Sequence, residues 1–169
     1  RLVDPRVVAL ARPDARRIAV GKTPGRPSVG QAAINAMLVA EALAGHRVVR
    51  LKGGDPLVFG RAVEELAALA AHGIPVTVVP GVTAALAAAA AARLPLTARG
   101  RRRALTLLTG HAEDGPAAHD WAALARTGQP LAVYMGVAAG PGMARHLMAA
   151  GPPPATPVGV AEHATLPTH

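Results

Sequence analysis

Two glycines and an aspartate near the middle of the chain have the clearest chemical use. Gly53, Gly54 and Asp55 directly follow an apolar run, Arg47–Leu51, which predicts a buried strand. In open parallel sheets, ligands bind beyond the carboxyl ends of the strands. Glycines at that place let a ligand approach the main chain, and Asp55 can accept a hydrogen bond from a hydroxyl or an amino group. The alternative is a strained turn in which Asp55 only caps local structure.

A second loop has the same form. Pro80–Thr83 follows the predicted strand Pro75–Val79, and Thr83 can cap the helix expected after it. If both strands end at one edge of a sheet, the two loops bracket one small ligand. Lys22 follows a third predicted strand, Arg17–Val20, and could bind an anion or transfer a proton at the same edge. Capping alone for Thr83 and a plain surface position for Lys22 are the alternatives.

The sequence lacks the residues that several other kinds of functional site require. The sequence holds no cysteine, which excludes disulfides, thiolate metal sites and cysteine nucleophiles. The seven histidines show no His-x-x-x-His or His-Glu-x-x-His spacing, so no metal site is expected. The sequence also has no Gly-x-x-x-x-Gly-Lys-Ser/Thr phosphate loop, no Gly-x-Gly-x-x-Gly turn and no Gly-x-Ser-x-Gly nucleophile elbow.

Composition and charge are those of a globular protein with basic surfaces. The 169 residues are 51% hydrophobic and 17% charged, which is not the composition of a disordered chain. No apolar run reaches the roughly 20 residues of a transmembrane helix, and no signal peptide is visible, so we expect a cytoplasmic protein without a membrane partner. The net charge is +8, and five arginines gather between Arg93 and Arg103. This cluster either favours an anionic partner or is simply solvated.

Alternating strands and helices predict an α/β fold with two domains. Further strands are expected at Ala104–Thr109, Pro130–Met135 and Thr156–Ala161. Helices are expected at Ser28–Ala44, Arg61–Ala71, Thr83–Ala92, His119–Ala125 and Gly142–Ala149. In the second of these helices, the apolar face contains Val63, Leu66, Ala67 and Ala70. We expect an N-terminal domain with a parallel sheet over residues 1–95, a linker over 96–103, and a smaller, incomplete C-terminal domain with a mixed sheet over 104–169.

In their order along the chain, these residues match a known family. Arg50–Arg61 (RLKGGDPLVFGR) resembles the hallmark motif of uroporphyrinogen-III C-methyltransferases, which are S-adenosylmethionine-dependent tetrapyrrole methylases. Further matches lie at Gly73–Pro75, Val79–Ala84, Leu96–Thr97, Thr109–His111 and Tyr134–Gly136. The resemblance covers nearly the whole chain. Its most specific part is Arg50–Arg61, since related cobalamin-pathway and diphthine methylases carry looser versions of this motif.

The resemblance implies two α/β domains with the active site in the cleft between them, and usually a homodimer. It implies that the chain binds S-adenosylmethionine, releases S-adenosylhomocysteine, and methylates rings A and B of uroporphyrinogen III to give precorrin-2 for siroheme or cobalamin biosynthesis, without a metal. The implied cofactor contacts are Gly53, Gly54, Asp55, Val58, Thr83, Ala84, Met135 and Ala164. Lys22 matches a proton-donating lysine, and the positions that face the tetrapyrrole are Arg61, Glu64 and Arg99. Arginine suits this substrate because it binds carboxylates through two parallel hydrogen bonds.

The sequence also departs from the family pattern. A glycine-proline-rich first loop and a proton-accepting aspartate are expected before Arg1. Ala62–Val63 stands where relatives have two glycines, Ala98 where they have histidine, and Ala164 where they have glycine. Three alternatives stay open: a methylase that acts later in corrin synthesis, an inactive truncated paralogue, and a basic module that binds nucleic acid. The scarcity of aromatic residues counts against the last.

Overall fold

The structure divides into an N-terminal unit and a C-terminal unit. The computed structural model describes residues 3–21, 29–112, 115–116, 118–162 and 164–165. Contacts between Cα atoms divide it into Arg1–Val82 and Thr83–His169. The domain limits predicted at residues 95 and 104 stay a prediction. The predicted linker contains a turn, since Ala98 and Arg102 form an isolated antiparallel bridge.

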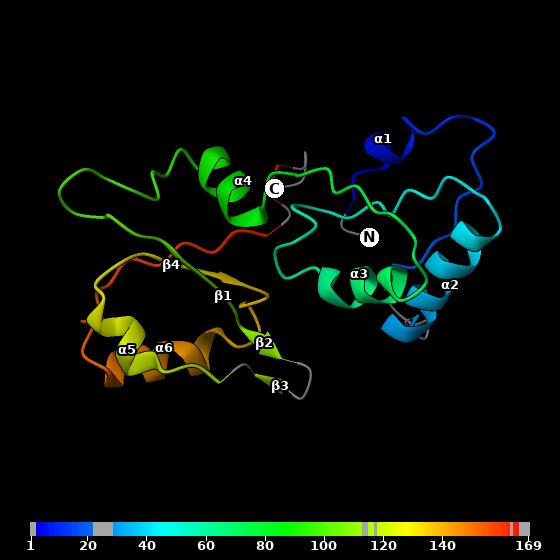
Figure 1. Ribbon diagram of the computed structural model, residues 1–169. Coiled ribbons are helices and arrows are strands. Elements are labelled where there is room, and N and C mark those ends of the chain that lie inside the picture. Colours follow the sequence, from blue (N-terminus) through cyan, green and yellow to red (C-terminus); the bar gives the residue numbers. More distant parts are fainter. Residues whose placement is uncertain (1–2, 22–28, 113–114, 117, 163, 166–169) are drawn as a thin grey trace. The chain divides into compact units, whose positions relative to one another are not determined.

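Helices carry the core of the first unit. They are α1 (Pro5–Val8), α2 (Gln31–Leu43) and α3 (Ala62–Ala70). Helices α2 and α3 lie side by side (Figure 1). Ile34 and Leu38, four residues apart on one face of α2, are buried. The predicted helices at 28–44 and 61–71 are therefore confirmed to within three residues at each end.

The buried face of α3 differs from the predicted one. Val63 is 81% exposed, whereas Glu65 is only 5% exposed. The prediction that Val63 lies on the buried face is wrong, because α3 turns a charged residue inward. That residue is stabilised by cations from the segment before α3, Arg50 and Lys52.

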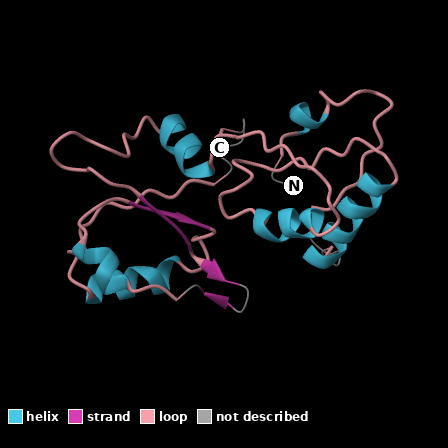
Figure 2. Ribbon diagram, viewed as in Figure 1, coloured by secondary structure: helices cyan, strands magenta, loops and turns pink. Residues whose placement is uncertain are grey.

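Three segments that were predicted as strands have no strand partner in the first unit. Arg17–Val20, Arg47–Leu51 and Pro75–Val79 are irregular segments, drawn as loops in Figure 2. The N-terminal parallel sheet predicted from their apolar sequences is therefore not formed among the described residues. A parallel strand takes its backbone hydrogen bonds from neighbouring strands, and no described segment pairs with these. Val49 and Val79 are accordingly 79% and 76% exposed.

The second unit carries a parallel pair of strands between helices. Its strands are β1 (Thr106–Thr109), β2 (His111–Ala112), β3 (Gly115–Pro116) and β4 (Leu131–Tyr134). Its helices are α4 (Ala84–Ala91), α5 (Trp121–Arg126) and α6 (Gly140–Ala149). β1 pairs with β4 in parallel, with Thr109 opposite Tyr134. Helix α4 contacts β4, and α5 and α6 contact each other on the other side of the pair (Figure 1). Leu108 and Ala89 are its buried apolar residues among those described.

Two sheet predictions for this unit need correction. Instead of one mixed sheet, the described residues form two separate pairs, parallel β1–β4 and antiparallel β2–β3. The strand predicted at Thr156–Ala161 is absent from the described structure. Thr156 instead donates through its backbone amide and its hydroxyl to the Pro153 carbonyl, at 2.9 and 2.6 Å, in a turn. Pro157 has no amide hydrogen to give to a ladder.

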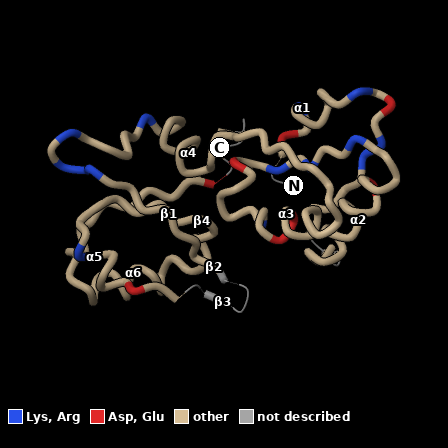
Figure 3. The backbone as a smooth tube through the Cα atoms, in the orientation of Figure 1, with Lys and Arg blue, Asp and Glu red and all other residues tan. Residues whose placement is uncertain are grey.

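The arginine cluster lies on an exposed loop. In Figure 3, basic residues gather along the segment between α4 and β1. All five arginines from Arg93 to Arg103 are exposed.

No helix in the described ranges has both the length and the apolar character needed to cross a bilayer.

Candidate functional site

The loop Gly53–Val58 is a tight turn held by its own aspartate. Gly54 has a φ of 75°, in the region that glycine adopts most readily. One carboxylate oxygen of Asp55 accepts from the Leu57 amide at 2.9 Å, and the Val58 amide donates to the Asp55 carbonyl at 3.4 Å. Gly53 and Gly54 are exposed. The turn therefore presents bare main chain to solvent, and its use as a ligand loop stays a prediction.

Asp55 also joins this loop to the second predicted loop. Its other carboxylate oxygen accepts from the Gly81 amide at 3.1 Å. A Cβ on Gly81 would lie 2.3 Å from the Gly54 carbonyl oxygen, closer than any side chain allows, so only glycine fits there. The two loops therefore lie together within the first unit, although the sheet edge on which the sequence placed them is not formed among the described residues. Hydrogen bonds from the backbone of Leu57, and then of Gly81, hold the pKa of Asp55 below its usual range.

Arg61 and Glu64, two of the predicted substrate residues, are paired with each other. Arg61 donates from Nε and Nη2 to the two oxygens of Glu64 at 2.8 and 2.7 Å. The hydrogen bond from Arg61 holds the pKa of Glu64 below its usual value. Both side chains are close to half exposed, at 49% and 42%. Arg61 has a φ of 56°, uncommon for a residue with a side chain, so the local backbone is strained at a predicted functional position.

In the second unit, Thr83 and Ala84 begin α4 beside the end of β4. Thr83 occupies the N-cap position as predicted, but its side chain makes no capping hydrogen bond. Its hydroxyl lies 2.6 Å from the Tyr134 hydroxyl, and the Ala85 amide donates to that same Tyr134 oxygen at 3.2 Å. Tyr134 therefore takes over the capping role that the sequence assigned to Thr83.

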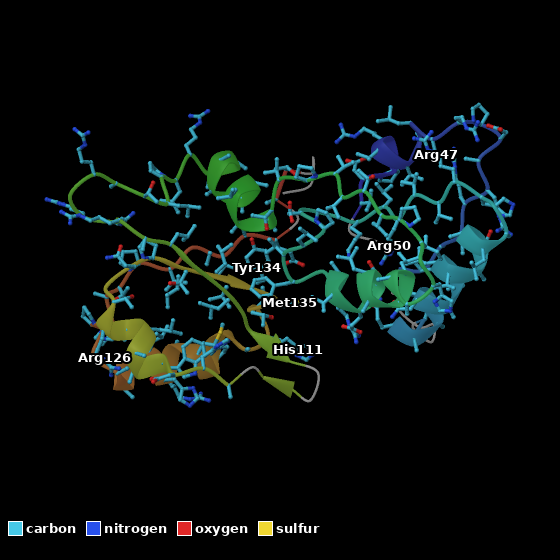
Figure 4. The ribbon with its side chains drawn as sticks, viewed as in Figure 1. Arg47, Arg50, His111, Arg126, Tyr134 and Met135 are labelled. Atoms are coloured by element: carbon cyan, nitrogen blue, oxygen red, sulfur yellow. The ribbon has the colours of Figure 1, made fainter. Side chains whose placement is uncertain are left out.

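Met135 follows Tyr134 in an uncommon conformation. It has a φ of 54° and is 57% exposed, and Figure 4 shows it beside Tyr134 at the end of β4. Gly110, which follows β1, and Gly136, which follows Met135, allow the two strands to end close together. A Cβ on Gly110 would lie 2.8 Å from the Gly136 Cα, and one on Gly136 would lie 2.9 Å from Val133 Cγ1. Met135 is thus an exposed residue in a constrained turn.

The remaining predicted residues are not brought into these clusters. Arg99 is exposed in the turn of the predicted linker, and Ala164 is half-buried in a turn near the end of the described chain. Lys22, the predicted proton donor, lies outside the described residues. Their assignments remain predictions.

A hollow of about 720 Å³ lies in the second unit, and Thr83, Ala84 and Met135 are not among its lining residues. Its wall includes Trp121 and His146, whose rings are nearly parallel with centroids 6.2 Å apart, and Arg145. Across the described residues there is no group of three or more histidine or acidic side chains that could hold a metal ion.

Sequence reasoning missed Glu65 and Tyr134 as members of these clusters. Glu65 accepts from Gln31, Arg50 and Lys52, which are 34, 15 and 13 residues away in the sequence. In the sequence, Tyr134 stood out only as part of the match at Tyr134–Gly136, and its bonds to the start of α4 cross about 50 residues. The sequence held one signal, and it concerned Glu65: this residue is a glutamate among apolar neighbours in α3. A charged residue on a helix that packs against another needs partners for its charge.

Comparisons with known proteins agree with one another on the family. A family model described as Tetrapyrrole (Corrin/Porphyrin) Methylases matches residues 1–169. The chain is 50% identical over 165 residues to a siroheme synthase of Tolumonas auensis, and 47% identical over 167 residues to one of Azotobacter vinelandii. These alignments cover 98% and 99% of this chain but only 35% and 36% of those proteins, so the chain spans about a third of their length.

Solved structures are similar as well. The uroporphyrin-III C-methyltransferase of Thermus thermophilus, complexed with S-adenosylhomocysteine, matches with a TM-score of 0.74 and 43% identity, covering 91% of this chain and 64% of that one. A cobalt precorrin-4 methyltransferase of cobalamin biosynthesis matches with a TM-score of 0.74 and 26% identity, covering 89% of this chain and 61% of that one.

Proposed function

The chain belongs to the tetrapyrrole (corrin/porphyrin) methylase family, and on that premise we propose that it is the methyl-transferring part of a uroporphyrinogen-III C-methyltransferase. The observation that carries the proposal is the 43% identity to the Thermus thermophilus enzyme over 91% of this chain. Because the chain spans about a third of its curated relatives, the activity, the cytoplasmic location and a homodimeric assembly are proposed for the complete polypeptide.

The residues present fit S-adenosylmethionine as the methyl donor. Exposed main chain at Gly53 and Gly54 can hydrogen-bond its polar groups. Met135, which is exposed, offers a polarizable thioether as an apolar contact. The other proposed contacts are Asp55, Val58, Thr83, Ala84 and Ala164. When bound, the cofactor supplies an electrophilic methyl group on a sulfonium centre.

The chain's own residues would bind and orient the tetrapyrrole. Arg61 and Arg99 would hold carboxylates of uroporphyrinogen III, since guanidinium stays charged and matches a carboxylate with two hydrogen bonds. Glu64 would accept from a pyrrole N–H while it keeps Arg61 in place. Lys22 would donate a proton. Holding the pyrrole carbon in line with the methyl group is the main catalytic task, because alignment can remove a large part of the barrier. The product would be precorrin-2, which leads to siroheme or cobalamin.

The test is binding and turnover with the complete polypeptide. Calorimetric titration with S-adenosylhomocysteine is expected to show saturable binding. Incubation of uroporphyrinogen III with methyl-labelled S-adenosylmethionine, without oxygen, is expected to transfer two methyl groups. If the polypeptide does not bind the cofactor, the alternative of an inactive truncated paralogue is favoured. Salt-sensitive RNA binding without cofactor binding would favour the nucleic-acid module.

A methylase that acts on a later corrin intermediate is the second candidate. The similarity to cobalt precorrin-4 methyltransferase supports it, at a TM-score of 0.74 but only 26% identity. The two candidates differ in substrate. Methylation of a corrin intermediate with no transfer to uroporphyrinogen III would favour the second.

A further inference from the structure

Glu65 is a buried carboxylate at the base of the loop that carries Gly53 and Gly54. It lies in the first turn of α3 and is 5% exposed. Its Oε1 accepts from Gln31 Nε2 at 3.2 Å and from Arg50 Nε at 3.1 Å. Its Oε2 accepts from Lys52 Nζ at 2.9 Å. Both oxygens therefore have partners, and Figure 4 shows Arg50 beside α3.

The ionised form of Glu65 is maintained at this buried position. Burial by itself would raise its pKa, but the hydrogen bond from Lys52, followed by that from Gln31 and the charge of Arg50, brings the pKa below its usual value. A buried ion pair is weak evidence for stability, since well-packed apolar residues in its place are often equally stable. The cluster calls for an explanation other than stability.

Lys52 connects this carboxylate to both ends of the loop. It directly precedes Gly53, is 11% exposed, and its ammonium also donates to the Gly60 carbonyl. A Cβ on Gly60 would lie 2.8 Å from the Pro56 carbonyl oxygen and 3.1 Å from Lys52 Cε. The lysine stem therefore occupies the space that a side chain at Gly60 would need. One side chain thus ties residue 52 to residue 60 and closes the loop.

We propose that Glu65 is a positioning residue for the cofactor loop. It fixes Lys52, and Lys52 fixes the main chain from Gly53 to Gly60, so that the amides of Gly53 and Gly54 are held ready for a ligand. A loop that is already ordered loses less entropy when it binds. Glu65 is assigned no contact with cofactor or substrate. This inference rests on the proposed function for the identity of the ligand, but not for the ordering of the loop.

The first test is Glu65→Gln in the complete polypeptide. The variant keeps the size of the side chain and removes the charge that holds Lys52. We expect its Kd for S-adenosylhomocysteine and its KM for S-adenosylmethionine to rise about tenfold, as expected for loss of a charged hydrogen bond. Because the reacting groups are unchanged, kcat should stay within about threefold. A merely structural role would lower the melting temperature and the folded fraction and leave Kd unchanged.

Two further variants test whether the effect depends on the position of Glu65 and on its charge. Glu41 is another ion-paired glutamate of the first unit, bound to Arg16 and to His46, and Glu41→Gln should leave Kd unchanged. Glu65→Asp keeps the charge and should recover part of the affinity. If Glu65→Gln does not fold, the double variant Lys52→Met with Glu65→Leu replaces the pair by apolar side chains. This double variant should fold, and it should bind the cofactor more weakly than the wild type does, because the loop has lost its tie to Lys52.

Hydrogen exchange at the amides of residues 53–60 tests the ordering without any ligand. Faster exchange in Glu65→Gln than in Glu41→Gln is expected. If the wild-type protein does not bind S-adenosylhomocysteine but this difference in exchange is found, the proposed function fails and the positioning role stands. A folded Glu65→Gln variant with wild-type exchange and wild-type cofactor affinity would overturn the inference.

Discussion

The hydroxyl of Tyr134 lies 2.6 Å from the hydroxyl of Thr83 and also accepts from the Ala85 amide at 3.2 Å. Thr83 is 8% exposed, so this contact is shielded from water. The end of β4 is thereby tied to the start of α4. Because Thr83 and Met135 are both proposed cofactor contacts, Tyr134 links two segments that would contact the same ligand.

Removing only this hydroxyl should weaken cofactor binding. Tyr134→Phe leaves the ring in place but deprives Thr83 and the Ala85 amide of a partner. We expect a loss of about 1–2 kcal/mol in the free energy of unfolding and roughly threefold to tenfold weaker binding of S-adenosylhomocysteine, measured by denaturation and calorimetry. Thr127→Val is the control, because it removes a similar hydroxyl contact of 2.7 Å with the Leu124 carbonyl. Equal cofactor affinity in both variants would contradict a role for Tyr134.

A side chain at Gly81 should separate the two loops of the first unit. In Gly81→Ala, the new Cβ would lie 2.3 Å from the Gly54 carbonyl oxygen, so one loop must shift. We expect a destabilisation of about 1–3 kcal/mol from this overpacking, together with loss of cofactor binding. Gly159→Ala is the matched control because nothing lies within 4 Å of its Cβ position. The prediction fails if Gly81→Ala melts at the wild-type temperature.

The sequence predicted local features well and long-range polar contacts poorly. Apolar periodicity predicted α2, a run of alanines predicted α4, and glycines after apolar runs predicted the two loops that meet at Gly54 and Gly81. Glu65 was missed because its partners lie 13 or more residues away in sequence, and hydrophobic periodicity contains no information about which charges meet.

The strand predictions failed in the first unit for a related reason. An apolar run such as Pro75–Val79 indicates that burial would be favourable, but not that a neighbouring strand is present to supply hydrogen bonds. Where a neighbour exists, the same reasoning succeeded: β1 and β4 lie within the predicted strands and pair in parallel.

The charge of Asp55 should make the loop junction sensitive to acid. Backbone donation from Leu57 and Gly81 lowers its pKa in the folded state below the usual 3.8. A lowered pKa contributes stability above the unfolded-state value, and this contribution is lost as the pH falls through the folded-state value. The difference in melting temperature between wild type and Asp55→Asn should therefore be largest near neutral pH and shrink below about pH 4.

Asp14 supplies the control for this titration. It is an exposed aspartate whose carboxylate lies 3.6 Å from Arg12 Nε, and Asp14→Asn should change the melting temperature little at any pH. A difference between wild type and Asp55→Asn that stays constant down to acid pH would show that the ionised form of Asp55 adds nothing.

The pair Arg61–Glu64 should determine tetrapyrrole affinity without affecting the cofactor. Arg61 engages Glu64 through two parallel bonds of 2.8 and 2.7 Å, a geometry that a lysine cannot reproduce. Arg61→Lys keeps the charge, so any change reports the loss of the planar fork. We expect the KM for uroporphyrinogen III to rise about tenfold while the Kd for S-adenosylhomocysteine stays unchanged.

Arg16→Lys is the matched control for this last prediction, because Arg16 is also paired with a glutamate of the first unit, Glu41. It should change neither constant. If Arg61→Lys instead weakens cofactor binding and leaves the KM for the tetrapyrrole unchanged, Arg61 acts on the loop that precedes it and not on the substrate. If both constants stay at their wild-type values, the pair with Glu64 is a surface ion pair of the ordinary weak kind, and the carboxylates of the tetrapyrrole are bound elsewhere.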